Sequence, residues 1–158
     1  MKELDINEVL KYFYEISRIP RMSGKEEKIA DYIENFATER NLKYIRDIYN
    51  NIIIFKDSTK WNKTDEGIMV CEKEENSNHD FEKEGLEVYI EGDYIKAKDT
   101  TLGADNGIGV AIILAILNSN KIKHPKIEAI FTVQEETTME GAKQIDVSML
   151  KSKKMICL

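Results

Sequence analysis

The stretch Ile52-Ile53-Ile54-Phe55 decides the fold class, because every one of its four positions is β-branched or aromatic. A strand with no polar side is typical of a sheet that is covered on both faces. Residues 127–133 form a second apolar run of this kind. We therefore expect a sheet packed between helices rather than a sheet with one face in water.

Helical patterns alternate with these strands. Apolar residues recur at helical spacing over residues 9–16 and 29–37, each preceded by a cap-like pair, Asp5 with Glu8 and Ser23 with Glu26. This alternation predicts an α/β fold, namely an incomplete layered domain with a mixed, mostly parallel sheet and helices on both faces. The single domain expected spans residues 1–158. Further strands are expected at 42–48, 67–71, 86–90, 94–97 and 155–158, with a turn at 101–107. An apolar helix is expected at 108–118, in which Ile112, Ile113 and Leu117 are buried. A short helix is expected at 148–151.

Composition excludes several classes of protein. The chain of 158 residues is 42% hydrophobic and 33% charged, with a formal net charge of −6. We expect no nucleic-acid partner, because such proteins normally carry a basic patch. We also expect no membrane partner, because no apolar stretch reaches the length of a membrane-spanning helix. Two distant cysteines, Cys71 and Cys157, give no disulfide framework, which favours a cytoplasmic location.

The first segment that could carry chemistry is the glycine-rich stretch of residues 100–109, TTLGADNGIG. It places Asp105 near the start of an apolar helix, where a charged carboxylate is favoured and suits a metal ligand. The alternative is that Asp105 caps this helix and has no further role. This segment alone does not separate the two interpretations.

The second segment is residues 131–142, FTVQEETTMEGA, in which an apolar strand runs directly into Glu135 and Glu136. Ligands of α/β proteins gather at the carboxyl ends of strands. Two carboxylates at such a place can hold a divalent cation, or one of them can act as a general base on a water bound to the metal. The alternative is an ordinary charged loop in solvent.

Taken together, the two segments resemble motifs of the aminoacyl-histidine dipeptidases (Xaa-His dipeptidases), which belong to the co-catalytic zinc metallopeptidases. Residues 100–111 are similar to the motif of the bridging aspartate, and residues 131–142 are similar to the Glu-Glu motif. Shorter matches lie at residues 19–27 (IPRMSGKEE), 71–73 (CEK) and 78–83 (NHDFEK). The resemblance covers nearly the whole chain, but only the N-terminal part of a full-length family member.

The resemblance implies a metallodipeptidase, a hydrolase of dipeptides that uses a metal-activated water. Asp105 would be the carboxylate that bridges two divalent metal ions, most often zinc. Glu136 would be a ligand of one metal, and Glu135 would be the catalytic base that takes a proton from the water. The resemblance also implies a cis peptide bond between Asp105 and Asn106, and the fold of the family's catalytic domain.

The sequence departs from the family where a further metal ligand is expected. The family carries a His-x-Asp-Met-Val motif, and Met69-Val70 match its end. However, Glu66 stands at the histidine position and Ile68 stands at the aspartate position. The strand before this motif is replaced by polar residues, as if about ten residues were deleted from the connection. The later ligands, the lid domain for dimerisation and the C-terminal half have no counterpart in the 158 residues.

Only Asp105 and Glu136 therefore match the metal ligands of the family, and we expect the chain alone to be inactive. The alternatives are a non-catalytic remnant, one half of a split protein, or another exopeptidase or deacylase of the same superfamily. We also expect missing strand length to expose apolar surface and so to favour self-association. His79 and His124 lie outside the ligand positions of the family, so we expect both to be ordinary surface residues.

Overall fold

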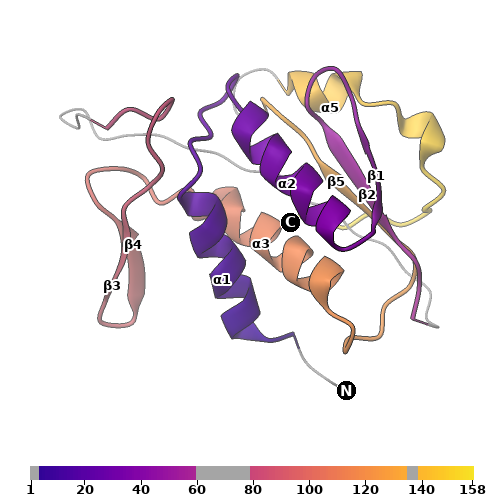
Figure 1. Cartoon of the computed structure of the whole chain (residues 1–158), viewed down its shortest axis with the longest axis horizontal. Helices are drawn as coiled ribbons and strands as arrows, with labels where there is room; N and C mark the ends of the chain where they lie inside the picture. The colour runs from indigo at the N-terminus through magenta and orange to yellow at the C-terminus, as the bar shows by residue number, and fades with distance from the viewer. Residues whose placement is uncertain (1–3, 60–78, 135–138) are drawn as a thin grey trace.

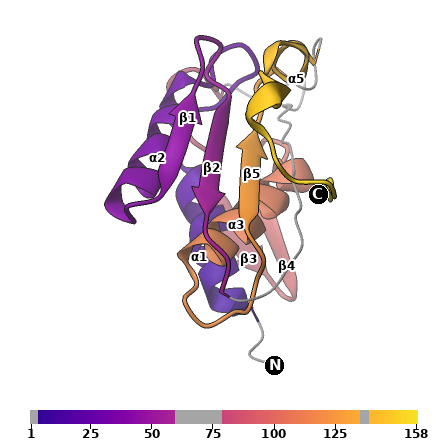
Figure 2. The ribbon, with the colours of Figure 1, turned by 90° about the vertical axis from the view of Figure 1, so that its right-hand side faces the viewer.

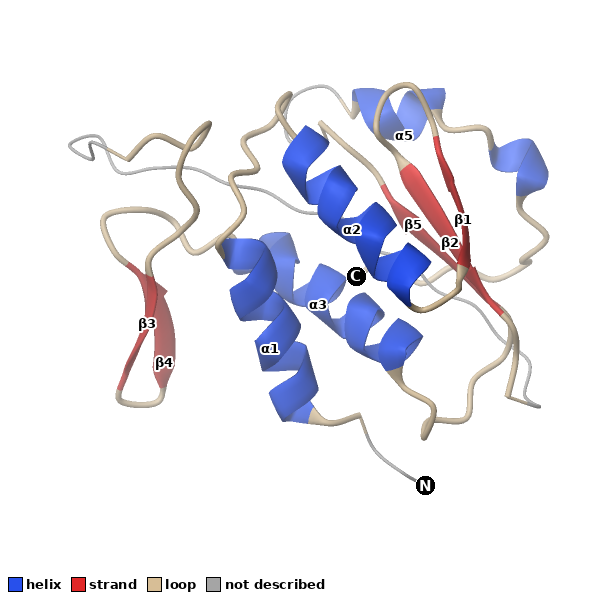
Figure 3. Ribbon diagram, in the orientation of Figure 1, coloured by secondary structure: helices blue, strands red, loops and turns tan. Residues whose placement is uncertain are grey.

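The computed structural model describes residues 4–59, 79–134 and 139–158. Its elements are four α-helices, a 3₁₀ helix and five strands in the described residues, arranged as in Figures 1 and 3. They are α1 (Ile6–Ser17), α2 (Glu27–Glu39), β1 (Lys43–Arg46), β2 (Ile52–Lys56), β3 (Val88–Glu91), β4 (Tyr94–Ala97), α3 (Ala104–Asn118), β5 (Ile127–Phe131), α5 (Glu140–Gln144) and η1 (Val147–Met149).

Three of the strands form one sheet in the order β1-β2-β5, and both pairings are antiparallel. The expectation of a mostly parallel sheet is therefore wrong for the described strands. That expectation rested on the alternation of helices with strands and on the apolar runs at residues 52–55 and 127–133. Such runs report burial on both faces and carry no information on strand direction. The β1–β2 direction follows from the short turn between the two strands, since a turn of this length can only join antiparallel neighbours.

Burial on both faces of β2 is confirmed, because Ile52, Ile53 and Ile54 are all buried. Side chains of a strand alternate between faces. Ile52 and Ile54 enter the core formed with α1, α2 and α3, together with Ala129 and Phe131 of β5. The other face is covered by the segment that holds α5 and η1, which lies across the sheet from α2 in Figure 2.

The helices follow the predicted patterns, with two differences. Asp5 caps α1 by accepting a hydrogen bond from the Asn7 amide. Ser23, in contrast, does not cap α2, whose first flanking residue is Glu26. The apolar helix starts earlier than predicted, at Ala104, so the expected turn at 101–107 is partly helical. Within this helix Ile113 and Leu117 are buried as predicted, and Ile112 packs partly buried against the core.

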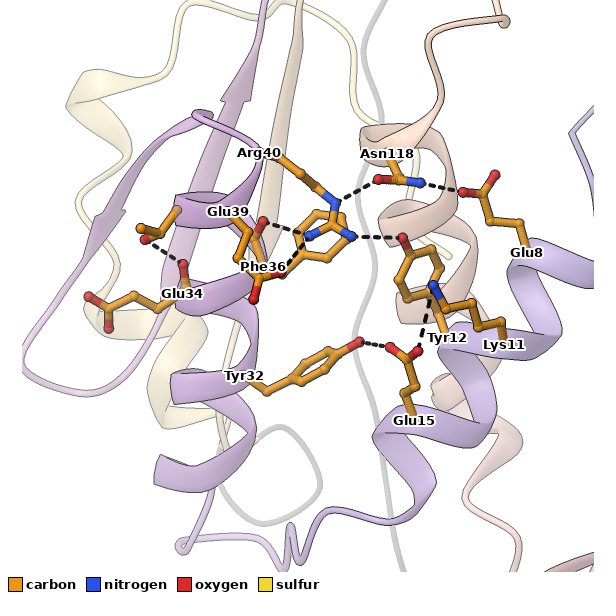
Figure 4. A network of polar contacts seen from close by, with 11 residues as sticks. Glu8, Lys11, Tyr12, Glu15, Tyr32, Glu34, Phe36, Glu39, Arg40 and Asn118 are labelled. Atoms are coloured by element: carbon orange, nitrogen blue, oxygen red, sulfur yellow. Dashed lines mark hydrogen bonds and ion pairs between the residues drawn. The ribbon is translucent and has the colours of Figure 1, made fainter.

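A guanidinium joins the three long helices where they meet (Figure 4). Arg40, at the end of α2, lies 3.8 Å from the ring centre of Phe36 and donates to the Tyr12 hydroxyl of α1 at 3.2 Å. Its Nε donates to the Asn118 side chain at the end of α3 at 2.6 Å, and Asn118 in turn donates to Glu8. Three segments far apart in sequence are thereby joined through one side chain.

The remaining strand predictions differ in outcome. β3 and β4 form the expected hairpin across Gly92 and Asp93. Residues 155–158 are not a strand; Met155, Ile156 and Leu158 are exposed. The predicted strand at 67–71 lies outside the described residues. None of the described helices is long and apolar enough to cross a membrane.

Candidate functional site

Asp105 lies in a kink at the start of α3. Gly103 precedes the helix with a φ of 61°, and Asp105 and Asn106 have non-helical backbone angles inside it. The peptide bond between Asp105 and Asn106 is cis, as the resemblance implies. Asp105 itself is exposed to solvent. The carboxylate therefore stands at the surface on a backbone that departs from regular helix.

Asn106 holds the shape of this kink. Its buried side chain accepts a hydrogen bond from the Gly109 amide at 2.8 Å and donates to the Leu158 carbonyl oxygen. A Cβ on residue 109 would lie 2.2 Å from the Asn106 Oδ1, so any larger residue there would displace the Asn106 side chain. Gly109 thus serves close packing around Asn106, a role that the motif alone did not reveal.

The capping interpretation of Asp105 finds no support. The residue before α3 is Gly103, and no side chain caps the helix. Within the described residues, the Asp105 carboxylate takes part in no hydrogen bond or ion pair of its own. It is therefore a carboxylate without a structural task in this part of the chain, which leaves it able to bind a ligand.

Glu135 and Glu136, the predicted base and metal ligand, lie outside the described residues. Glu66, Ile68 and Cys71 also lie outside them. The flanks of the Glu-Glu segment are described and begin at the carboxyl end of β5. In both Figure 1 and Figure 2 this end of β5 and the start of α3 point toward the same end of the molecule. The structure therefore directs both motif segments to one end of the sheet.

Asn51 joins the two flanks of the Glu-Glu segment, and sequence reasoning did not find it. Its side chain is 1% exposed, accepts a hydrogen bond from the Val133 amide at 3.2 Å, and donates to the Gly141 carbonyl oxygen at 3.0 Å. The Gly141 amide donates directly to the Val133 carbonyl oxygen at 3.2 Å. The chain thus leaves the sheet at Val133 and returns to the same place at Gly141.

Two further contacts fix this position. The Asn51 amide group also donates to Asp47 at 2.7 Å, which orients it. The amide of Gln134, the residue before Glu135, donates to Glu26 at 2.9 Å. A Cβ on residue 141 would lie 2.4 Å from the Val133 carbonyl oxygen, so a glycine is required. The glycine after the Glu-Glu motif is the signal in the sequence that could have indicated this close return.

A pair of metal ions is not accounted for by the described residues. Among them no group of three or more His, Cys, Asp and Glu side chains is placed to hold a metal ion. Asp105 is the one predicted ligand that they contain, and a lone carboxylate is a weak site for zinc, which prefers nitrogen and sulfur ligands as well. The described part of the chain therefore does not by itself fit a two-metal centre.

The two histidines do not contribute to this site. His79 is only partly exposed and lies 3.6 Å from Glu84. His124 is 4% exposed, so the prediction of a surface residue is wrong for it. The turn of chain around Thr59 covers His124, since the Thr59 amide donates to its carbonyl oxygen and its own amide donates to the Thr59 hydroxyl. Burial lowers the pKa of His124, and the nearby Lys56 lowers it further.

Comparison with known proteins shows which proteins this chain resembles. The chain is 39% identical over 137 residues to the cytosol non-specific dipeptidase of Escherichia coli, a match that covers 82% of this chain and 28% of the relative. The structure matches an aminoacylhistidine dipeptidase from Vibrio alginolyticus with a TM-score of 0.90 and 37% identity, over 98% of this chain and 33% of that one. The chain belongs to the family of these dipeptidases.

The match covers only part of each of these dipeptidases. The chain spans about a third or less of the length of both relatives. A tripeptidase from Staphylococcus aureus matches with a TM-score of 0.80 at 20% identity, which supports the peptidase fold alone. No family model matches the chain. The predicted resemblance and the α/β peptidase fold are confirmed.

Proposed function

We propose that residues 1–158 form a single partial catalytic domain of a dipeptide hydrolase. The observation that carries the proposal is the similarity to two dipeptidases over most of this chain. The relatives' names refer to dipeptides and to aminoacylhistidine, so the substrate class proposed is dipeptides, including those that end in histidine. A cytoplasmic location is supported by the name of the Escherichia coli relative.

In this proposal Asp105 is the metal-bridging carboxylate, Glu136 is a metal ligand and Glu135 is the catalytic base. The exposed and unpaired carboxylate of Asp105 within the described residues is consistent with its role. The cofactor would be two divalent ions, zinc by preference. Asn51 and Glu26 are the described residues that hold the backbone on either side of the Glu-Glu segment. Exposed apolar side chains, such as Met155 and Ile156, favour self-association of the chain.

We further propose that the 158-residue chain alone does not hydrolyse dipeptides. Two carboxylates, Asp105 and Glu136, cannot complete two metal sites, and general-base help from Glu135 is worth about 10²–10⁴-fold only where a polarised water is present. Ile68 replaces the aspartate that would orient the base. The 158 residues then bind zinc weakly or not at all until further metal-ligating side chains are supplied.

The experiment measures zinc binding and hydrolysis separately. Zinc affinity is determined by equilibrium dialysis for the chain, for Asp105→Asn, and for Glu82→Gln, which removes an exposed carboxylate away from both motifs. Hydrolysis of Xaa-His dipeptides is assayed with added zinc, manganese or cobalt. We expect weak zinc binding that Asp105→Asn alone reduces, and no hydrolysis. Metal-dependent hydrolysis that disappears in Glu135→Gln would refute the inactivity, whereas zinc binding unchanged by Asp105→Asn would refute the role of Asp105.

A further inference from the structure

A groove of about 780 Å³ lies across one end of the sheet, where β2 ends and β1 and β5 begin. This is a different place from Asp105 and the Glu-Glu segment, which belong to the carboxyl end of β5. The wall is completed by the chain just after η1. The apolar side chains that line the groove are Phe55, Pro125, Ile127 and Met149.

The groove is rich in lysine, although the chain as a whole is acidic. Two carboxylates, Asp57 and Glu128, also line it, but Glu128 accepts hydrogen bonds from the amides of residues 151 and 152 at 2.9–3.1 Å. Asp57 lies 3.8 Å from Lys126 in a largely exposed ion pair, which contributes little. The lining lysines are Lys43, Lys56, Lys126, Lys151 and Lys153.

Three of these five lysines have no ion-pair partner among the described residues. Lys126 has its exposed pair with Asp57, and the Lys56 ammonium donates to three carbonyl oxygens at the end of α3 at 2.6–3.0 Å. In the described part of the chain, no carboxylate lies within ion-pair distance of Lys43, Lys151 or Lys153. The groove therefore combines an apolar lining with unbalanced positive charge, which suits an acidic segment of protein that also carries apolar side chains.

The β3–β4 hairpin has this chemistry. Ile90 and Tyr94 on either side of its turn are 68% and 72% exposed, although both are large and apolar. The turn between them carries Glu91 and Asp93. Glu91 pairs with Lys96 of the same hairpin, and Asp93 has no ion pair among the described residues. The hairpin tip is thus an acidic turn flanked by two exposed apolar side chains.

The hairpin and the groove lie on opposite sides of the molecule. Figure 1 shows the hairpin beyond α1, whereas the sheet and the chain after η1 lie on the other side of the helices. The hairpin of one molecule therefore cannot enter its own groove. A second copy of the chain can supply it, because each copy presents one hairpin and one groove.

We propose that the β3–β4 hairpin of one copy docks into the lysine-lined groove of a second copy. Glu91 and Asp93 would face the lysines, and Tyr94, which is paired with Glu91 and lies on the same face of the hairpin, would cover the apolar lining. The contact joins two different surfaces, so it is head-to-tail and builds chains or rings rather than a two-fold symmetric dimer. A nucleic acid would satisfy the lysines but would leave the apolar lining unmatched.

The test reverses the charge on each surface separately. The groove variant carries Lys126→Glu and Lys153→Glu, and the hairpin variant carries Glu91→Lys and Asp93→Lys; circular dichroism confirms that both fold. Sedimentation velocity follows association from about 10 µM to about 1 mM, the range of weak contacts. We expect the unaltered chain to associate beyond a dimer, with an apparent Kd about tenfold higher in about 500 mM salt than in about 50 mM salt.

Each variant alone is expected to associate much more weakly than the unaltered chain, because like charges then meet at every contact between hairpin and groove. A mixture of the two variants is expected to associate again, since the acidic hairpin of one fits the lysines of the other and the reversed pair is also complementary. A monomeric unaltered chain throughout the concentration range overturns the proposal. Association that neither variant weakens also overturns it and assigns the contact to other surface, such as Met155 and Ile156. Groove-dependent binding of a single-stranded oligonucleotide, with no self-association, overturns it in favour of a nucleic-acid partner.

Discussion

Replacing Asn51 with alanine is expected to lower the free energy of unfolding by about 3 kcal/mol. The side chain makes three hydrogen bonds in a site that is 1% exposed, and each such bond contributes about 0.5–1.5 kcal/mol net. The three hydrogen-bond partners of Asn51 are affected differently by its removal. The Gly141 carbonyl oxygen still accepts from the Ile145 amide, and Asp47 still accepts from the backbone amide of residue 51. The buried Val133 amide, however, is left without its acceptor, which costs about 1–3 kcal/mol.

Urea denaturation followed by circular dichroism measures this loss, with Asn120→Ala as the matched control at an exposed asparagine. The control should change the free energy of unfolding by less than about 0.5 kcal/mol. Asn51→Asp keeps an acceptor for Val133 but places a second carboxylate beside Asp47, so its loss should shrink as the pH falls and the carboxylates are protonated. A loss below about 1 kcal/mol in Asn51→Ala would refute the reasoning, since three buried hydrogen bonds cannot disappear at so small a cost.

Three further changes test other parts of the structure. Lys56→Met should cost about 2 kcal/mol in urea denaturation, because charged donors to the last carbonyls of a helix contribute about this much, and an unchanged midpoint would contradict the contact. The melting temperature should fall as the pH is lowered through 6.5. Burial lowers the pKa of His124, so the unfolded state then binds a proton that the folded state does not. His124→Gln should flatten this profile of melting temperature against pH. Gly109→Ala should cost about 1–3 kcal/mol, since its methyl group collides with Asn106, and a variant as stable as the unaltered chain would show that the kink can relax.

Local pattern was sufficient to predict most elements but not the direction of the sheet. The four apolar positions from Ile52 predicted a strand buried on both faces, because burial depends on side chains alone. Strand direction depends on how the connections run, and the turn at residues 47–50 decides it for β1 and β2. His124 was misjudged for a similar reason. It stands in the polar stretch Lys123-His124-Pro125-Lys126, whereas the residue that covers it, Thr59, is distant in sequence.

The candidate site shows the same division. Asp105 could be identified from its motif, because the glycines and the carboxylate are adjacent in the chain. Asn51 could not be identified, since a single asparagine after a turn resembles many others. Its partners Val133 and Gly141 lie 82 and 90 residues away in the sequence. Contacts of this kind become visible only when the fold brings the three segments together.

The Arg40 guanidinium has a consequence for the motions of the helical layer. Its contacts reach α1 through Tyr12 and α3 through Asn118 while its own stem belongs to α2. Local opening of any one helix end therefore breaks bonds that the other two also use. Amide hydrogens in the adjoining turns of α1, α2 and α3 should then exchange with solvent at one shared rate, as a single cooperative unit, instead of fraying helix by helix.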